Sequence, residues 1–151
     1  MHLNRVIAVS SSGGHLTELI EALPENIVDE ILFVTSFDER SDDLLKAHKK
    51  KFYITDPNGE IKRYFLNFLQ SVNIVIRERP NVVISTGSGI AFFILVLSWL
   101  IGSKIIYVES GARLNKLSKT GMLLYRFADL FIVRSEALSN KYPKAVRARM
   151  F

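Results

Sequence analysis

Short apolar runs alternate with amphipathic stretches along most of this 151-residue chain. Each run has the length of a buried strand, and the stretches between the runs repeat apolar residues at helical spacing. Strands are predicted at residues 5–10, 30–35, 51–55, 81–85, 104–110 and 129–134. Helices are predicted at residues 16–23, 41–50 (opened by Ser41), 61–79, 90–101 and 120–128, with a short one ending near Tyr142. This alternation predicts an α/β fold, a Rossmann-like parallel sheet with helices on both faces.

Two of the predicted helices carry enough apolar residues to contact either the sheet or a membrane surface. The helix at 61–79 has one apolar face and basic residues near both ends; the face consists of Ile61, Tyr64, Phe65, Phe68, Leu69, Val72, Val75 and Ile76. The helix at 90–101 is apolar all round but shorter than the 20 or so residues that span a bilayer. Burial against the sheet is the first expectation for both, and peripheral contact with a membrane surface is the alternative.

Composition and charge narrow the kinds of ligand. The chain has no cysteine, which excludes disulfides and thiolate chemistry, and no metal-ligand cluster or signal peptide is visible. Its net charge of +5 suits phosphates, anionic lipid or nucleic acid. Scattered basic residues without a recognition motif disfavour nucleic acid. The length predicts one domain over residues 1–151.

The first candidate site is a glycine corner, "SSSGGH", between the first strand and the first helix. Ser12, Gly13 and Gly14 can cradle a phosphate at the helix start, where backbone amides point outward. A tight turn that binds nothing is the alternative. His15 can donate to a phosphate or act as a base, or it is a surface or capping residue.

The corner does not match the dinucleotide pattern G-x-G-x-x-G, because Gly13 and Gly14 are adjacent. Asp38 or Glu39 follows the second strand and can stand where a ribose-binding acid does. A nicotinamide-binding oxidoreductase is therefore kept as a weaker alternative.

A second glycine corner, "STGSG", follows the fourth strand and contains Thr86, Gly87, Ser88 and Gly89. Ligands of such sheets bind outside the carboxyl ends of the strands. Two corners at that edge favour a phosphate-bearing ligand over two plain turns.

Polar residues also end and follow the predicted fifth strand, whose last residues are Glu109 and Ser110. Glu109 can act as a base or bind a sugar hydroxyl, or it pairs with Arg113 or caps the next helix. Arg113 and Lys116 can hold phosphates, or they belong to a solvated basic loop.

Four segments resemble one family: "SSGGHLTEL", "STGSG", "KIIYVESGAR" and "LSKTGMLLYRFADLFIVRSEALSNKYPKA". It is the oligosaccharide-biosynthesis family that includes the membrane-recruiting subunit of the two-part dolichol-linked N-acetylglucosaminyltransferase. Its bacterial members serve capsule and exopolysaccharide synthesis. The resemblance covers about Val6 to Ala145 and extends to the N-terminal half of two-domain glycosyltransferases of the GT-B type.

The resemblance implies an acceptor-binding, membrane-associating subunit that acts without a cofactor. A small catalytic partner chain would carry the nucleotide-sugar site, and a sugar would pass from a UDP-sugar to a lipid-diphosphate-linked saccharide. Gly13, Gly14 and His15 match one phosphate-facing loop of the family, and Gly87 and Gly89 match the other. His15 or Glu109 would be the base of an inverting transfer.

The eukaryotic members of the family carry an N-terminal membrane anchor, whereas this chain begins almost at its first strand and ends near the family's usual end. Attachment to the membrane is therefore expected from helix 61–79, helix 90–101, the lipid substrate or the partner. The expected location is the cytoplasmic face of a membrane, the bacterial inner membrane. A non-catalytic scaffold for the partner is the main alternative function.

Overall fold

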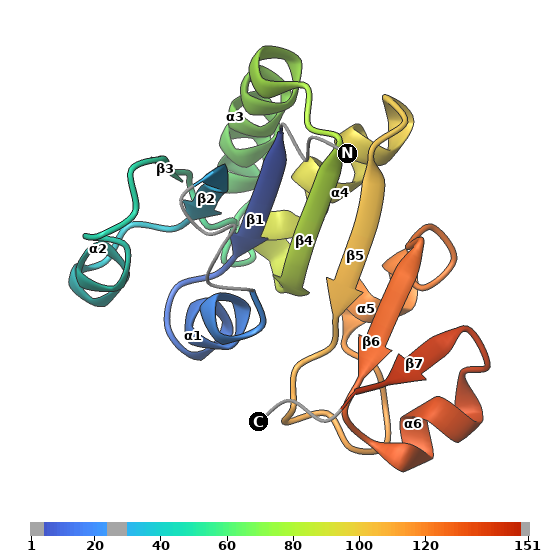
Figure 1. Ribbon diagram of the computed structural model, residues 1–151. Coiled ribbons are helices and arrows are strands. Elements are labelled where there is room, and N and C mark those ends of the chain that lie inside the picture. The colour runs from blue at the N-terminus through green and yellow to red at the C-terminus, as the bar shows by residue number, and fades with distance from the viewer. Residues whose placement is uncertain (1–4, 24–29, 149–151) are drawn as a thin grey trace.

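The computed structural model describes residues 5–23 and 30–148. Their seven strands form one parallel sheet in the order β3-β2-β1-β4-β5-β6-β7 (Figure 1). The strands are β1 (Val6–Ser10), β2 (Leu32–Thr35), β3 (Lys51–Tyr53), β4 (Val82–Gly87), β5 (Lys104–Val108), β6 (Leu130–Val133) and β7 (Ala145–Arg147). The predicted α/β fold with a Rossmann-like parallel sheet is confirmed.

The helices divide between the two faces of the sheet (Figure 1). They are α1 (Gly14–Glu21), α2 (Glu39–Leu44), α3 (Ile61–Glu78), the short 3-10 helix η2 (Gly89–Ala91), α4 (Phe92–Leu100), α5 (Lys119–Leu124) and α6 (Glu136–Lys141). α1 and α2 pack on one face through Leu16, Leu19 and Leu45. The other helices pack on the opposite face, where Ile94, Leu95, Leu124 and Leu138 are buried.

Several strand predictions need correction. β2 begins, and β3 and β5 end, two residues inside the predicted strands, so Glu109 lies just past β5. β7 was not predicted, because three residues with two exposed side chains show no periodicity; it forms by parallel pairing with β6. β4 continues to Gly87, two residues past the predicted end. Thr86 and Gly87 are therefore part of the sheet, and the second corner turns at Ser88.

The prediction that Ser41 opens the second helix is wrong. Asp38 is the N-cap of α2, and its Oδ1 accepts from the Ser41 backbone N–H at 2.6 Å. The Ser41 hydroxyl in turn accepts from the Asp38 N–H at 3.0 Å. Both residue types cap helices well, and this reciprocal pair favours the earlier one.

Most of the apolar face predicted for the long helix does not face the sheet, although Val75 of that face is buried in the core. α3 buries Asn67, Ser71, Ile74 and Val75, whereas Ile61 is 87% exposed. The apolar stripe lies roughly a quarter turn from the buried side of the helix. The prediction failed because polar side chains fill the buried side, and periodicity alone does not reveal their partners.

The end of α4 is also exposed. Ile94, Leu95 and Ser98 are buried, as predicted for this helix, but Trp99, Leu100 and Ile101 are 41–65% exposed. Among residues 5–23 and 30–148, no helix is both long and apolar enough to cross a membrane.

Buried Asn67 connects α3 to the carboxyl edge of the sheet. Its Nδ2 donates to the Thr55 carbonyl at 2.8 Å and to the Ile90 carbonyl at 3.2 Å. Its Oδ1 accepts from the Ser71 hydroxyl at 3.4 Å. The side chain thereby fixes the start of the helix that follows the second corner.

Asn67→Ala should lower the free energy of unfolding by about 2 kcal/mol, because the buried Ile90 carbonyl and the partly buried Thr55 carbonyl lose their donor. Urea unfolding followed by circular dichroism measures the change. Asn73→Ala on the exposed side of α3 is the matched control and should stay within about 0.5 kcal/mol of wild type. Equal midpoints for the two variants would contradict the role assigned to Asn67.

Candidate functional site

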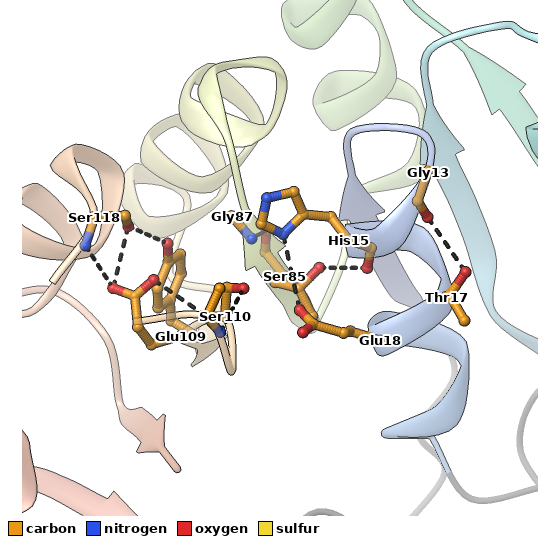
Figure 2. Close-up of polar contacts among 12 residues, drawn as sticks. Gly13, His15, Thr17, Glu18, Ser85, Gly87, Glu109, Ser110 and Ser118 are labelled. Atoms are coloured by element: carbon orange, nitrogen blue, oxygen red, sulfur yellow. Dashed lines mark hydrogen bonds and ion pairs between the residues drawn. The ribbon is translucent and has the colours of Figure 1, made fainter. Parts of the chain in front are cut away.

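Three strand ends meet at the carboxyl edge of the sheet. β1, β4 and β5 are neighbours, so the two glycine corners and Glu109 lie along one edge. Figure 2 shows His15 at the start of α1 and Glu109 just past β5, on either side of the end of β4. Sheet topology thus brings together residues that are far apart in the sequence.

The first corner leads into α1 without a side-chain cap. Gly13 is the N-cap with a φ of +80°, which favours glycine, and its carbonyl accepts from the Thr17 N–H at 3.2 Å. A Cβ added to Gly13 or Gly14 would meet no atom within 4 Å. The first amides of a helix have no partner within it, so this open corner can receive an anion.

The second corner is held in a strained conformation. Gly87 has a φ of +99°, and a Cβ there would collide with the Tyr107 hydroxyl. Its N–H donates to the Ser85 hydroxyl at 3.0 Å. Ser88 also has positive φ, +81°, which its side chain makes unfavourable.

One hydrogen bond joins the two corners. The Thr86 hydroxyl donates to the His15 carbonyl at 2.8 Å. The pairing of β1 with β4 shifts register after Val9, so that Ser10 lies opposite Gly87. The start of α1 is therefore fixed to the end of β4.

A cleft of about 720 Å³ opens beside the joined corners. It is lined by His15, Thr86, Ser88, Tyr107, Glu109, Ser110, Ala112, Arg113, Leu117, Ser118, Lys119 and Thr120. Five of the predicted site residues are in this lining. Ser12, Gly13, Gly14, Gly87 and Gly89 lie at the corners but not in the lining.

Two buried polar atoms of the cleft residues have no hydrogen-bond partner: His15 Nδ1 and the Ser88 hydroxyl. The His15 ring is 37% exposed, and its Nδ1 lies 3.9 Å from Glu18 Oε2, too far for a hydrogen bond. Buried polar atoms of native proteins are almost always paired. Both atoms therefore have hydrogen-bonding capacity that the described residues leave unused.

Glu109 is engaged by its own loop. It is 2% exposed, and its Oε2 accepts from the Ser118 N–H at 2.9 Å and the Ser118 hydroxyl at 3.1 Å. Its Oε1 accepts from the Ser110 N–H at 3.1 Å. A Cβ on Gly121 would collide with the same carboxylate. The ion pairs of the described residues include none between Glu109 and Arg113, so Glu109 shapes the loop that carries Arg113.

The sequence reasoning did not predict seven residues of the cleft lining, and Tyr107, Ser118 and Lys119 are the ones that bear on its chemistry. The Tyr107 hydroxyl lies 3.1 Å from the Ser118 hydroxyl, and burial, followed by the charge of Glu109, raises the pKa of Tyr107. Ser118 is the N-cap of α5, a role that its place before the helix could have indicated. Lys119, rather than Lys116, supplies a cation to the cleft.

Asp38 lies beside the first corner but serves the scaffold. Hydrogen bonding with the Ser12 side chain, and then with the Ser41 backbone, lowers the pKa of Asp38. This carboxylate caps α2, so its position gives no independent support to a ribose site. In the part of the chain that the structure describes, no group of three or more His, Asp or Glu side chains is placed to hold a metal ion.

Comparison with known sequences gives one consistent family. The family described as "Oligosaccharide biosynthesis protein Alg14 like" matches residues 58–150. The Candida albicans UDP-N-acetylglucosamine transferase subunit ALG14 is 33% identical over 88% of this chain and 71% of its own length. The human protein of that name is 27% identical over 93% of this chain and 80% of its own length. The Yarrowia lipolytica one is 38% identical, over only 53% of this chain and 40% of its own.

Solved structures share the fold at low identity. Acinetobacter baumannii MurG aligns with a TM-score of 0.67 and 14% identity over 87% of this chain. A putative UDP-N-acetylglucosamine 2-epimerase from Listeria monocytogenes aligns with a TM-score of 0.71 and 15% identity over 95%. The chain spans 42% of each of these proteins, which confirms the fold of the GT-B type at less than half their length. The family match over residues 58–150 and the Candida albicans relative show that the chain belongs to the Alg14-like family of oligosaccharide biosynthesis proteins.

Proposed function

We propose that this chain is the acceptor-binding, membrane-associating subunit of a two-chain glycosyltransferase, and that residues 1–151 form one domain. The observation that carries the proposal is the cleft beside two glycine corners joined by Thr86 and His15. The relatives' name, UDP-N-acetylglucosamine transferase subunit, supports a UDP-sugar donor. The acceptor is a saccharide linked to a lipid through a diphosphate.

The diphosphate of the acceptor would lie between the corners and the basic loop. The open first corner offers the backbone amides at the start of α1. Arg113 and Lys119 line the same cleft and supply positive charge. The Ser88 hydroxyl, which has no partner, is a further donor.

His15 is the proposed base of an inverting transfer. The acceptor hydroxyl oxygen bonds to the anomeric carbon of the donor sugar, the bond from that carbon to UDP breaks, and UDP leaves with the bonding electrons. The hydroxyl proton passes to the His15 imidazole, because this side chain lines the cleft and is 37% exposed. Glu109 already accepts three hydrogen bonds and is proposed as the residue that positions the cleft loop.

The nucleotide-sugar site is assigned to a small partner chain. The relatives are named as a subunit of a transferase, which supports a second chain. The first corner of this chain also departs from the dinucleotide pattern. The partner would face the carboxyl edge and place the donor sugar above His15.

Membrane contact is assigned to the outer side of α3 and the end of α4, called here the apolar face. Its exposed residues are Ile61, Phe65, Leu66, Leu69, Ile76, Trp99, Leu100 and Ile101. Lys62, Arg63, Arg77 and Arg79 accompany it, and Glu78 is the only acidic residue of α3. Exposed apolar residues with a basic border suit the surface of an anionic bilayer.

The proposed setting is the cytoplasmic face of a bacterial inner membrane, where UDP-sugars are available. The acceptor would belong to capsule or exopolysaccharide synthesis. A cysteine-free chain suits that reducing compartment.

His15→Ala should reduce the rate of sugar transfer by about 100-fold or more, because the base is lost. The assay uses the complex of this chain with the subunit that co-purifies with it, a panel of UDP-sugars and a lipid-diphosphate acceptor. His48→Ala is the matched control: its ring packs on Phe33 with ring centroids 4.6 Å apart, away from the cleft, and it should keep activity. Unchanged turnover in His15→Ala, with pairing intact, would leave this chain only a scaffold.

Glu109→Gln should lower the free energy of unfolding by about 2 kcal/mol, since the amide NH₂ must face the backbone N–H of Ser110 or Ser118. His15→Ala should change it by no more than about 0.5 kcal/mol. Thermal and urea unfolding of the isolated chain give both values. Wild-type stability in Glu109→Gln, together with lost turnover, would instead make Glu109 the base.

Phe65→Glu combined with Leu69→Glu should weaken sedimentation with lipid vesicles by at least about tenfold, because two side chains lose their contact with the bilayer. Both residues are exposed, so folding should be unaffected. Leu114→Glu combined with Leu123→Glu, two exposed apolar positions outside the apolar face, controls for the two added negative charges. Equal losses of vesicle binding in the apolar-face variant and the control variant would show that the apolar face does not contact the membrane.

A further inference from the structure

A second cavity, of about 680 Å³, lies at the amino ends of the strands, the opposite edge of the sheet from the cleft. It is lined by Arg5, Val75, Ile76, Arg79, Pro80, Asn81, Val82, Ile101, Gly102 and Lys104. Three of these residues are cations and none is acidic. None of them lines the proposed acceptor cleft, although Ile76 and Ile101 belong to the apolar face and Arg79 to its basic border.

The cavity stands on a fixed framework. The Asn81 N–H donates to the Arg5 carbonyl at 2.8 Å, and the Lys104 N–H donates to the Asn81 carbonyl at 2.8 Å. The Ser103 hydroxyl donates to the Pro80 carbonyl at 2.7 Å. The starts of β1, β4 and β5 are thus joined through their backbones, and the cationic positions are held relative to one another.

The donors of the cavity exceed its acceptors. Arg5 Nε donates to Asn81 Oδ1 at 3.3 Å, which leaves the Asn81 NH₂ group as a donor. Lys104 pairs with Asp129 at 2.8 Å, and the same carboxylate accepts from the Ile105 N–H. One carboxylate therefore offsets part of the charge of three cations. Guanidinium groups and an amide NH₂ are suitable ligands for phosphate oxygens.

Arg79 occupies a backbone position that favours glycine. It ends α3 with φ 43° and ψ 62°, in the left-handed region, and Pro80 follows. Glycine adopts this conformation at helix ends without the Cβ conflict that any other residue has. An arginine at this position lowers the stability of the fold. Because Arg79 lines the cavity, binding of an anion there would explain why the position is not glycine.

The cavity is continuous with the apolar face. Ile76 and Ile101 belong to both, and they are 64% and 54% exposed. A bilayer in contact with the apolar face would bring its lipid headgroups to the cavity. This step rests on the membrane contact proposed above.

We propose that the cavity binds the phosphate of an anionic membrane lipid through Arg5, Arg79, Lys104 and Asn81. The site would select anionic over neutral membranes, independently of the acceptor cleft.

The test compares vesicles of phosphatidylcholine alone with vesicles that also contain phosphatidylglycerol. Arg79→Gly should weaken binding to the anionic vesicles by about fivefold, the effect of one basic side chain near a charged surface. Binding to neutral vesicles should not change, and the melting temperature should stay equal or rise because strain at residue 79 is relieved. Sugar transfer to a detergent-soluble lipid-diphosphate acceptor should stay at the wild-type rate, which separates this site from the proposed function.

Arg40→Gln on α2, across the sheet from the apolar face, controls for the loss of one positive charge. Equal losses in Arg40→Gln and Arg79→Gly would show general attraction and overturn the site. Equal loss on both vesicle types in Arg79→Gly would also overturn it. So would stabilisation of the wild type, but not of Arg79→Gly, by inorganic phosphate without any change in vesicle binding, because the ligand would then be a soluble anion.

Discussion

The pairing of β1 with β4 at the centre of the sheet is the constraint on which the site depends. Strand order changes direction there, and ligands of open α/β sheets bind at such a point. The register shift after Val9 places Gly87 opposite Ser10, so the Thr86 hydroxyl reaches the His15 carbonyl. A slip of one residue would turn Thr86 to the other face of the sheet and separate the two corners.

Sequence pattern predicted the sheet because its strands are apolar runs with glycine or polar residues at their ends. It failed where a contact from elsewhere in the fold decides the outcome. The buried side of α3 depends on Asn67, whose partners are the Thr55 and Ile90 carbonyls. β7 depends on pairing with β6, because three residues are too few to show the alternation that predicts a strand. In each case the missing information was the identity of a distant neighbour.

The candidate site likewise has features that sequence pattern predicts and features that depend on contacts between distant residues. Glycines before a helix and an acid after a strand are visible in sequence, so both corners and Glu109 could be identified as candidates. The use of Glu109 was not visible, because its donors come from Ser110 and Ser118. Tyr107 reads as a core aromatic in sequence, yet its hydroxyl touches the cleft loop. Fold topology selects which polar residues meet, while residue type only limits what each can do.

α3 runs between the two edges of the sheet at which the cleft and the cationic cavity lie. In a strand–helix–strand unit the helix runs from the carboxyl edge back to the amino edge, and the 18 residues of α3 extend roughly 27 Å. A bilayer lying along its outer side would therefore reach both the acceptor cleft and the cationic cavity. A lipid diphosphate lies at headgroup depth, so it could enter the cleft while its lipid stays in the membrane. The exposed apolar stripe of α3 is consistent with that orientation, because burial within the domain does not account for it.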